Sequence, residues 1–305
     1  MRLGVLDLGS NTIHLQVMDA HVGARPTPTT NFKVELRLSE NLEDDGNVSA
    51  SGIAQLHAVL EEALDHAKQF DTDEILAFAT SAFREAKNGS EIIAEINSRY
   101  ELDLQILSGE DEARLTFLAV RRWLGWSAGK LLVLDIGGGS LEIALGDHES
   151  PDFALSLPLG AGRLTRDFLT GDPFSNRSIN NLENYVSETL KANLSSDLLT
   201  HEAEHFIATS KTFRTLARQA NYWYGDSQKV LEANALLGAI PRLADMTKVQ
   251  RAALPGVSSG RANQIVAGGI VARSIMEVLN ISELEICPWA LREGVILKWL
   301  DWLER

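Results

Sequence analysis

An internal repeat constrains the fold more than any other feature of this 305-residue sequence. Residues 3–19 (LGVLDLGSNTIHLQVMD) align without gaps with residues 131–147 (LLVLDIGGGSLEIALGD). In each copy an apolar run ends in Asp, passes through a turn rich in Gly, Ser or Asn, and resumes with alternating apolar and polar residues. This pattern predicts a β-hairpin with one buried face. Chance similarity between two buried hairpins is the alternative to a duplication.

A second match favours duplication. Ala-Thr-Ser occurs at 79–81 and again at 208–210, an offset of 129 that is close to the 128 of the hairpins. Between hairpin and Ala-Thr-Ser, each half carries apolar residues at helical spacing. These are Ile53, Leu56, Leu60, Leu64 and Ala67 in the first half, and Ile179, Leu182, Val186 and Leu190 in the second. Each half therefore predicts strands, a helix, a strand and a helix, which is the order of a layered α/β domain.

The predicted domains span residues 1–114 and 115–305. A helix with apolar residues at Leu115, Leu118, Ala119 and Trp123 leads into the second hairpin. The last quarter predicts a further helix, a strand and a closing helix, at 265–279, 284–287 and 290–305 respectively. The closing part of that last helix, 295–305, is a candidate to pack back on the first domain.

Charge and composition exclude several classes of partner. There are 28 basic and 42 acidic residues, a net charge of −14, whereas proteins that bind long nucleic acids normally present a basic surface. A small phosphorylated ligand in a local site stays compatible with this balance. No apolar run approaches the roughly 18 residues of a membrane span, and the N-terminus lacks the apolar stretch of a secretory signal. Cys287 is the one cysteine, so no internal disulfide can form, and we expect a cytoplasmic protein by elimination.

The turn of the second hairpin has the chemistry of a phosphate site. Successive glycines let backbone N–H groups point at an anion with no Cβ in the way. The candidate phosphate ligands here are Gly137, Gly138, Gly139 and Ser140. The flanking carboxylates of Asp135 and Glu142 are hard oxygen ligands that suit Mg²⁺. The alternative is a glycine-rich turn between two solvated acids.

The turn of the first hairpin is the weaker counterpart. Ser10, Asn11 and Thr12 offer side-chain donors to the same phosphate group, and Asp7 aligns with Asp135. Without its counterpart in the second half, this turn would be weak evidence for a phosphate site. Two facing copies would clamp a phosphate between the halves, and the charge there calls for a metal, so Asp7 is a third candidate metal ligand.

Five segments, taken in order, resemble the motifs of the exopolyphosphatase/guanosine pentaphosphate phosphatase family. They are DLGSNTIHL at 7–15, ATSAFR at 79–84, LSGEDEA at 107–113, DIGGGSLE at 135–142 and LREGV at 291–295. The resemblance covers essentially the whole chain. It implies two ribonuclease-H-like domains of the actin, Hsp70 and sugar-kinase superfamily, with a phosphate site in a central cleft. It also implies hydrolysis of terminal phosphoanhydrides by water, dependent on Mg²⁺ with Mn²⁺ as an alternative.

The resemblance also assigns roles to residues of the first half. Glu112 matches the catalytic glutamate of the family, which implies a general base. Arg84 matches the arginine that reaches phosphate, and its alternative is an ion pair with Glu85 or another neighbour. Ser108 and Asp111 fit a helix-capping pair, which gives Asp111 a structural role. Glu110 belongs to the first turn of the same helix, where an acid favours the helix dipole.

The second Ala-Thr-Ser segment departs from the family, which more often has a glycine-rich loop there. Ser210 and Lys211 occupy those positions, followed by Arg214. A lysine there would offset substrate charge, so Lys211 is a candidate phosphate ligand. Arg163 and Arg261 are weaker candidates, for which structural or solvated roles are preferred.

Two further motifs are interpreted as structural. Gly268-Gly269 resembles the glycine pair that contacts adenosine in kinases of the superfamily, but close helix packing is the preferred interpretation. His201-Glu-Ala-Glu-His205 satisfies the HExxH zinc pattern, which requires both histidines on one helix face. The repeat makes residues 206–208 a strand, so the helix would end before His205, and we predict no zinc site.

The leading functional hypothesis is an exopolyphosphatase that acts on short linear polyphosphate. Guanosine pentaphosphate is the alternative substrate, and a kinase or a sensor without turnover are the other classes. The length leaves no room for the extra C-terminal domain of longer family members, which predicts a preference for short chains. By analogy with the family, the apolar helices after Val230 predict a homodimer.

Overall fold

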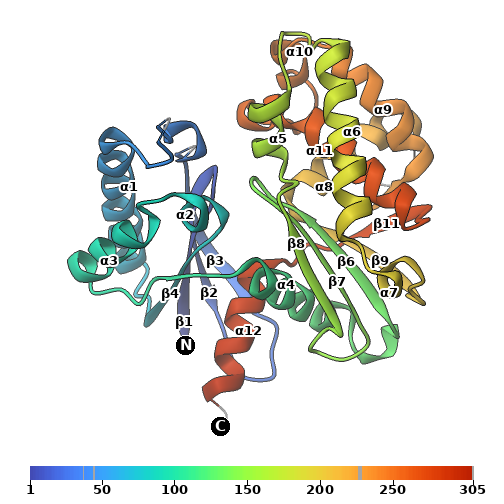
Figure 1. Ribbon diagram of the computed structural model, residues 1–305. Helices are drawn as coiled ribbons and strands as arrows, with labels where there is room; N and C mark the ends of the chain where they lie inside the picture. Colours follow the sequence, from blue (N-terminus) through green and yellow to red (C-terminus); the bar gives the residue numbers. More distant parts are fainter. Residues whose placement is uncertain (37, 44, 226–228, 304–305) are drawn as a thin grey trace. The chain divides into compact units, whose positions relative to one another are not determined.

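The computed structural model describes residues 1–36, 38–43, 45–225 and 229–303 (Figure 1). The chain divides into two compact units, residues 1–116 with 291–305 and residues 117–290. The predicted boundary lay two residues earlier, and the helix that closes the chain groups with the first unit from Leu291 onward. The last two residues of that predicted helix, 304–305, lie outside the described residues.

The first unit contains a five-stranded sheet in the order β3-β2-β1-β4-β5. β1, β2 and β3 are antiparallel, whereas β4 and β5 run parallel to β1. The strands are β1 (Arg2–Leu8), β2 (Thr12–Asp19), β3 (Thr27–Glu35), β4 (Glu74–Ala79) and β5 (Gln105–Ile106). The helical segments are η1 (Leu38–Asn41), α1 (Ala50–Gln69), α2 (Ser81–Glu85), α3 (Gly89–Tyr100), the start of α4 (Gly109–Leu124), and α12 (Leu291–Leu303).

The second unit repeats this plan. Its sheet has the order β10-β11-β9-β6-β7-β8, so that β8-β7-β6-β9-β11 corresponds to β3-β2-β1-β4-β5. The strands are β6 (Leu131–Ile136), β7 (Leu141–Gly146), β8 (Phe153–Leu157), β9 (His205–Thr209), β10 (Val230–Glu232) and β11 (Glu283–Ile286). The helical segments are η2 (Trp126–Ala128), α5 (Ala161–Phe168), α6 (Asn176–Asn193), α7 (Ser196–Leu199), α8 (Ser210–Tyr224), α9 (Ala233–Asp245), α10 (Lys248–Ala252) and α11 (Ser259–Val278). The α/β fold of two similar ribonuclease-H-like units is therefore confirmed.

Burial follows the predicted periodicities. On β1, Leu6 and Leu8 belong to the core that holds α1 and α3, whereas Leu3 and Val5 pack on the opposite face against α12. The strand is thus covered on both faces, which explains why its apolar run is nearly continuous. Helix α1 begins where the Ser49 hydroxyl accepts a hydrogen bond from the amide of Gly52, 3.1 Å away.

In the second unit, α6 presents the predicted stripe to the core through Leu182, Val186 and Leu190, each with no exposed surface. α11 is apolar on most of its surface because α5, α6, α8 and α9 all pack against it. Among the described residues, no helix is both long and apolar enough to cross a bilayer.

Candidate active site

The acids at the start of α4 take three different roles. The Ser108 hydroxyl accepts a hydrogen bond from the amide of Asp111 at 3.0 Å and donates to its carboxylate at 2.7 Å, so the predicted capping pair is confirmed. Glu110 points to solvent and forms an ion pair with Arg114 at 2.6 Å. Glu112 turns inward and is 7% exposed. A carboxylate this far from water needs a specific partner.

Arg84 is that partner. It lies at the end of the short helix α2, and its Nη1 donates to Oε1 of Glu112 at 2.7 Å and to the carbonyl of Leu107 at 2.6 Å. Of the two predicted interpretations of Arg84, phosphate contact and ion pair, the structure shows an ion pair, formed with Glu112. The pair fixes one carboxylate oxygen of a buried glutamate, and the Arg84 side chain remains 29% exposed.

The turn of the first hairpin is closed by a backbone hydrogen bond and tied to α2 by side chains. The amide of Gly9 donates to the carbonyl of Thr12 at 3.0 Å. The hydroxyl groups of Ser10 and Ser81 lie 2.8 Å apart and are both buried, so the turn is tied to the start of α2. The backbone carbonyl of Asn11 accepts a hydrogen bond from the amide of Leu36. Because a hydroxyl both donates and accepts, Ser10 can still bind a phosphate while it is paired with Ser81.

Two residues without a predicted role lie beside Asp7. His14 is directly opposite Asp7 in the pairing of β1 with β2. Arg292, at the start of α12, places Nη1 3.5 Å from a carboxylate oxygen of Asp7 and hydrogen-bonds to Nδ1 of His14. Burial raises the pKa of Asp7, while the charges of Arg292 and Lys33 oppose the rise. Asp7 is therefore already balanced by a cation of its own unit.

The sequence contained a signal for this arrangement. Arg292 belongs to the LREGV segment that resembles a family motif, although no role was predicted for it. The glycine of that segment, Gly294, packs so closely on α4 that a Cβ there would lie 1.9 Å from the carbonyl oxygen of Leu115. The motif thus joins α12 to the first unit and carries the arginine to Asp7.

The glycine turn of the second unit is held by its backbone. The carbonyl groups of Gly137 and Gly138 accept hydrogen bonds of 2.9–3.0 Å from the amides of residues 161–163, which open α5. A Cβ at Gly160 would lie 2.2 Å from the carbonyl carbon of Gly139, so this approach requires glycine. Arg163 donates from Nε to the carbonyl of Gly139 at 3.0 Å. The structural role preferred for Arg163 is thus to fix this turn.

The backbone amides of this turn differ from one another in their hydrogen bonding. Gly137 donates to the carbonyl of Ser140 at 2.9 Å, which closes the turn. In the part of the chain that the structure describes, no protein group accepts a hydrogen bond from the amides of Gly138 and Gly139. Adjacent backbone amides of this kind can bind the oxygen atoms of a phosphate.

The two acids that flank this turn form a cross-strand pair. Asp135 and Glu142 are directly opposite in the pairing of β6 with β7, which places them on the same face of the sheet. Glu142 is 5% exposed and accepts a hydrogen bond from the Ser156 hydroxyl at 2.9 Å.

Two carboxylates on one sheet face fit Mg²⁺, which binds through one or two carboxylates and otherwise prefers water and phosphate oxygens. No cluster of three or more metal-binding side chains occurs among the described residues. The donor set of this unit is therefore consistent with a magnesium ion that shares its ligands with a phosphorylated substrate.

The second Ala-Thr-Ser segment leads from β9 into α8. Ser210 adopts φ = +75°, a left-handed conformation that favours glycine. This conformation explains why a glycine-rich loop suits the position. Ser210, which stands where the family more often has such a loop, is therefore strained. Lys211 is exposed and donates to the Ser258 hydroxyl at 3.4 Å.

The other motifs of this unit are structural. A Cβ at Gly268 would lie 2.6 Å from Thr212, and one at Gly269 would lie 3.1 Å from Ile240, so the glycine pair permits close helix packing. Arg261 donates to the Thr212 hydroxyl at 2.8 Å.

The HExxH segment does not form a helix that carries both histidines. His205 lies on β9, where its Nδ1 is 2.9 Å from the Glu285 carboxylate. His201 lies before the strand, with Nε2 3.1 Å from the carbonyl oxygen of Leu279. The two rings therefore have different partners.

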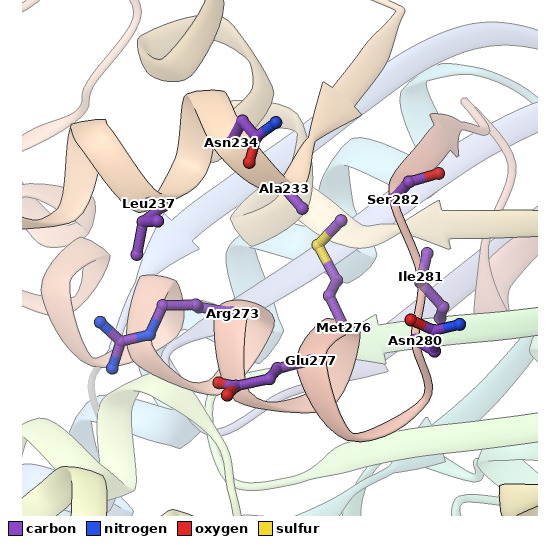
Figure 2. A pocket seen from close by; sticks show the side chains of 9 residues that line it. All are labelled: Ala233, Asn234, Leu237, Arg273, Met276, Glu277, Asn280, Ile281 and Ser282. Atoms are coloured by element: carbon purple, nitrogen blue, oxygen red, sulfur yellow. The ribbon is translucent and has the colours of Figure 1, made fainter.

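A cavity of about 370 Å³ lies elsewhere in the second unit, between the start of α9, the end of α11 and the turn that follows (Figure 2). Leu237, Arg273 and Met276 lie on its walls. Arg273 forms an ion pair of 2.7 Å with Glu183. None of the predicted site residues lines this cavity.

Comparisons with known proteins cover almost the whole chain. The model of the Ppx/GppA phosphatase family matches residues 17–303. Exopolyphosphatase 1 of Mycobacterium tuberculosis (strain ATCC 25618 / H37Rv) is 49% identical over 305 residues, 99% of this chain and 89% of the relative. The crystal structure of an exopolyphosphatase from Cytophaga hutchinsonii is 25% identical with a TM-score of 0.87, over 99% of this chain and 98% of that one. A Ppx/GppA family member from Aquifex aeolicus, 22% identical with a TM-score of 0.82 over 100% and 99% of the two chains, shares the fold.

Proposed function

Because the chain belongs to the Ppx/GppA phosphatase family, we propose that it is an exopolyphosphatase, an enzyme that hydrolyses the terminal phosphoanhydride of linear inorganic polyphosphate. The names of relatives at 49% and 45% identity support this activity. The observation that carries the proposal is the buried carboxylate of Glu112, held by Arg84 at the start of α4.

Hydrolysis of a phosphoanhydride requires a positioned water, a proton acceptor and positive charge around the phosphoryl oxygens. We assign the proton acceptor to Glu112, whose burial removes competing water. Arg84 fixes the orientation of that carboxylate, and its fork of donors suits a terminal phosphate.

Each turn supplies proposed phosphate ligands. In the second unit they are the amides of the glycine turn, with Lys211 as an additional cation. In the first unit they are the side chains of Ser10, Asn11 and Thr12. In each unit the turn already has a fixed shape, so little ordering would accompany binding.

We propose that Asp135 and Glu142 hold the metal. When bound there, Mg²⁺ or Mn²⁺ supplies positive charge that offsets the charge on the phosphoryl oxygens. Asp7 is a third proposed metal ligand. We expect it to contribute less to metal binding, because Arg292 already balances its charge. The preference for short chains, the homodimer and the cytoplasmic location stay predictions.

The direct test is phosphate release from tripolyphosphate in the presence of Mg²⁺, measured for the unmodified protein and for Glu112→Gln. Removing a general base lowers kcat by about 10²–10⁴-fold. Glu110→Gln is the matched control, because it removes an exposed acid from the same helical turn and should leave kcat within about twofold. No release by the unmodified protein, or equal rates for both variants, would refute the assignment.

Guanosine pentaphosphate is the second candidate substrate, since the matched family includes phosphatases of both names. Competition between it and tripolyphosphate would rank the two. A kinase would need a nucleotide at Gly268-Gly269, where helix packing already accounts for the glycines. A sensor without turnover would tolerate Glu112→Gln, so the same variant tests that class.

A further inference from the structure

The cavity of Figure 2 lies apart from the residues proposed for catalysis, phosphate binding and metal binding, because none of them lines it. Its volume of about 370 Å³ is within the range of small-molecule sites, which runs from about 300 to 1,000 Å³. Its lining comes from the start of α9, the end of α11 and the turn between α11 and β11. All of these segments belong to the second unit, so this unit forms the cavity by itself.

The most deeply buried side chains of the cavity are apolar. Met276 and Ile281 are 1% and 3% exposed, and Leu237 adds an exposed apolar wall from α9. Figure 2 shows the Met276 side chain reaching from α11 toward Ala233 on α9. A flexible thioether adapts its shape to an aliphatic ligand, whereas a bare metal ion prefers oxygen atoms. The cavity therefore suits an organic ligand with an apolar body.

The charged groups that line the cavity are Arg273 and Glu277, four residues apart on α11. This spacing would allow them to pair with each other. Instead, Arg273 forms its ion pair with Glu183 of α6, at 2.7 Å. Glu277 is exposed and forms no ion pair with any residue that the structure describes. The positive charge of the cavity is thus balanced from outside the lining, and the carboxylate of Glu277 is available to attract a cation.

The other polar groups of the lining are neutral. Asn234, Asn280 and Ser282 contribute two amides and a hydroxyl group, each of which contains an oxygen atom that accepts hydrogen bonds. Within the described part of the chain, these three side chains form no hydrogen bond with the protein. The residue after Ser282 is another exposed acid, Glu283, so the field at this end of the cavity is also negative. A ligand with a donor at each end would match both ends of the lining.

We propose that this cavity binds a short aliphatic diamine. One ammonium group contacts the carboxylate of Glu277, the alkyl chain lies against Met276 and Leu237, and the second ammonium group donates to the oxygen atoms of Asn280 and Ser282. An ammonium group has three donors and no acceptor, which suits oxygen atoms that have no protein partner. A phosphorylated or carboxylated ligand would add negative charge beside Glu277, which is unfavourable. This site goes beyond the proposed hydrolysis of polyphosphate and does not depend on it.

The test is calorimetric titration of putrescine into the full chain, with Mg²⁺ present so that the carboxylates proposed as metal ligands do not bind the amine. We expect one saturable site. Glu277→Gln should weaken binding by about tenfold, because a hydrogen bond between two charged groups is lost. Glu188→Gln is the matched control, since it removes an exposed acid from α6 and changes the net charge equally. Its Kd should stay within about twofold, because surface charges beyond about 10 Å are screened by salt. No saturable binding, or an equal loss in both variants, would overturn the site.

A second variant and two further ligands test the location and the class of ligand. Leu237→Ala shortens the exposed apolar wall and should weaken putrescine binding by about threefold. If Glu277→Gln fails to fold in a thermal melt, this variant decides the location, and an unchanged Kd would then contradict it. n-Butylamine keeps the alkyl chain with one ammonium group and should bind about tenfold more weakly than putrescine. Equal binding of the two amines would contradict a diamine, and tighter binding of succinate would overturn the choice of a cation.

Discussion

The hairpin of the first unit sets Asp7 opposite His14, and the hairpin of the second sets Asp135 opposite Glu142. These pairs occupy aligned positions of the repeat. Arg292 contacts both members of the first pair, so that its negative charge is balanced within the protein. The second pair consists of two acids, which is the type of side chain that Mg²⁺ binds. The same backbone thus sets one acid opposite a histidine, and in the second unit sets two acids opposite each other in a pair that suits a metal.

The two turns also differ in how they are held to neighbouring elements. Each turn is closed by an equivalent backbone hydrogen bond, from Gly9 to Thr12 and from Gly137 to Ser140. The first turn is tied to α2 by side chains, through the buried contact of Ser10 with Ser81. The second is fastened by backbone groups, through carbonyl groups that accept hydrogen bonds from the start of α5. The backbone of Gly160 can approach that of Gly139 in the second turn only because Gly160 has no side chain.

Gly160→Ala should have the largest effect. Its Cβ would overlap the backbone of Gly139 and displace the glycine turn, and a displacement of about 1 Å lowers catalytic rates by about 100-fold. Gly9→Ala in the first turn is the comparison, because its Cβ would be 3.3 Å from the carbonyl oxygen of Thr12. Steady-state phosphate release measures both variants. Equal losses would show that the two turns tolerate added side chains alike.

The next largest difference concerns the metal. Asp135→Asn should weaken Mg²⁺ binding by about tenfold or more, because Mg²⁺ depends on carboxylate ligands. Asp7→Asn should weaken it less, since Arg292 already pairs with Asp7. Calorimetric titration with Mg²⁺ provides a measurement that does not depend on activity. A greater loss in Asp7→Asn would reverse the comparison.

Arg292→Met should destabilise the first unit, because Asp7 loses its cation. For a pair about one-fifth exposed, we expect a loss of about 2 kcal/mol, less than for a fully buried pair. The melting temperature should then fall by about 4–8 °C. Adding Asp7→Asn should restore part of this loss because no charge is left uncompensated. If the double variant melts no higher than Arg292→Met, the two side chains are not coupled.

The smallest effects compare the Ala-Thr-Ser copies. Ser81→Gly removes the buried hydrogen bond with Ser10 and should cost about 1 kcal/mol. Ser210→Gly relieves a left-handed serine, which offsets the greater backbone freedom of glycine in the unfolded chain, so stability should stay within about 0.5 kcal/mol. Thermal melts of the two single variants make the comparison. A larger loss in Ser210→Gly would contradict it.

Much of the fold could be predicted from the sequence because the signals are local. Both hairpins, the stripes of α1 and α6 and the capping pair at Ser108 depend on residues near one another in the chain. The repeat also identified residues 206–208 as a strand, and β9 begins one residue earlier than predicted, at His205. Among the candidate site residues, Asp135 and Glu142 were placed correctly relative to each other because a hairpin sets its own register.

Contacts between distant segments could not be predicted in this way. Arg292 contacts His14 across 278 positions of sequence, and Ser10 contacts Ser81 across 71. Neither contact produces a periodic pattern in the sequence from which it could be predicted. The partner of Glu112 had the same character, since the predicted alternative to a phosphate contact for Arg84 was an ion pair with Glu85 or another neighbour, and the structure pairs Arg84 with Glu112 across 28 positions.

The sequence by itself determined the duplicated α/β plan, the two turns and the acidic residues beside them, because alternation of apolar residues and turn composition act over a few positions. Only the tertiary structure decided that Asp7 has a cation of its own. Helix α12 buries Ile296 and Leu300 against the sheet face that carries Leu3 and Val5, and this packing brings Arg292 to Asp7. Burial of apolar surface fixes the position of the helix, and the charge of the first turn is balanced as a result.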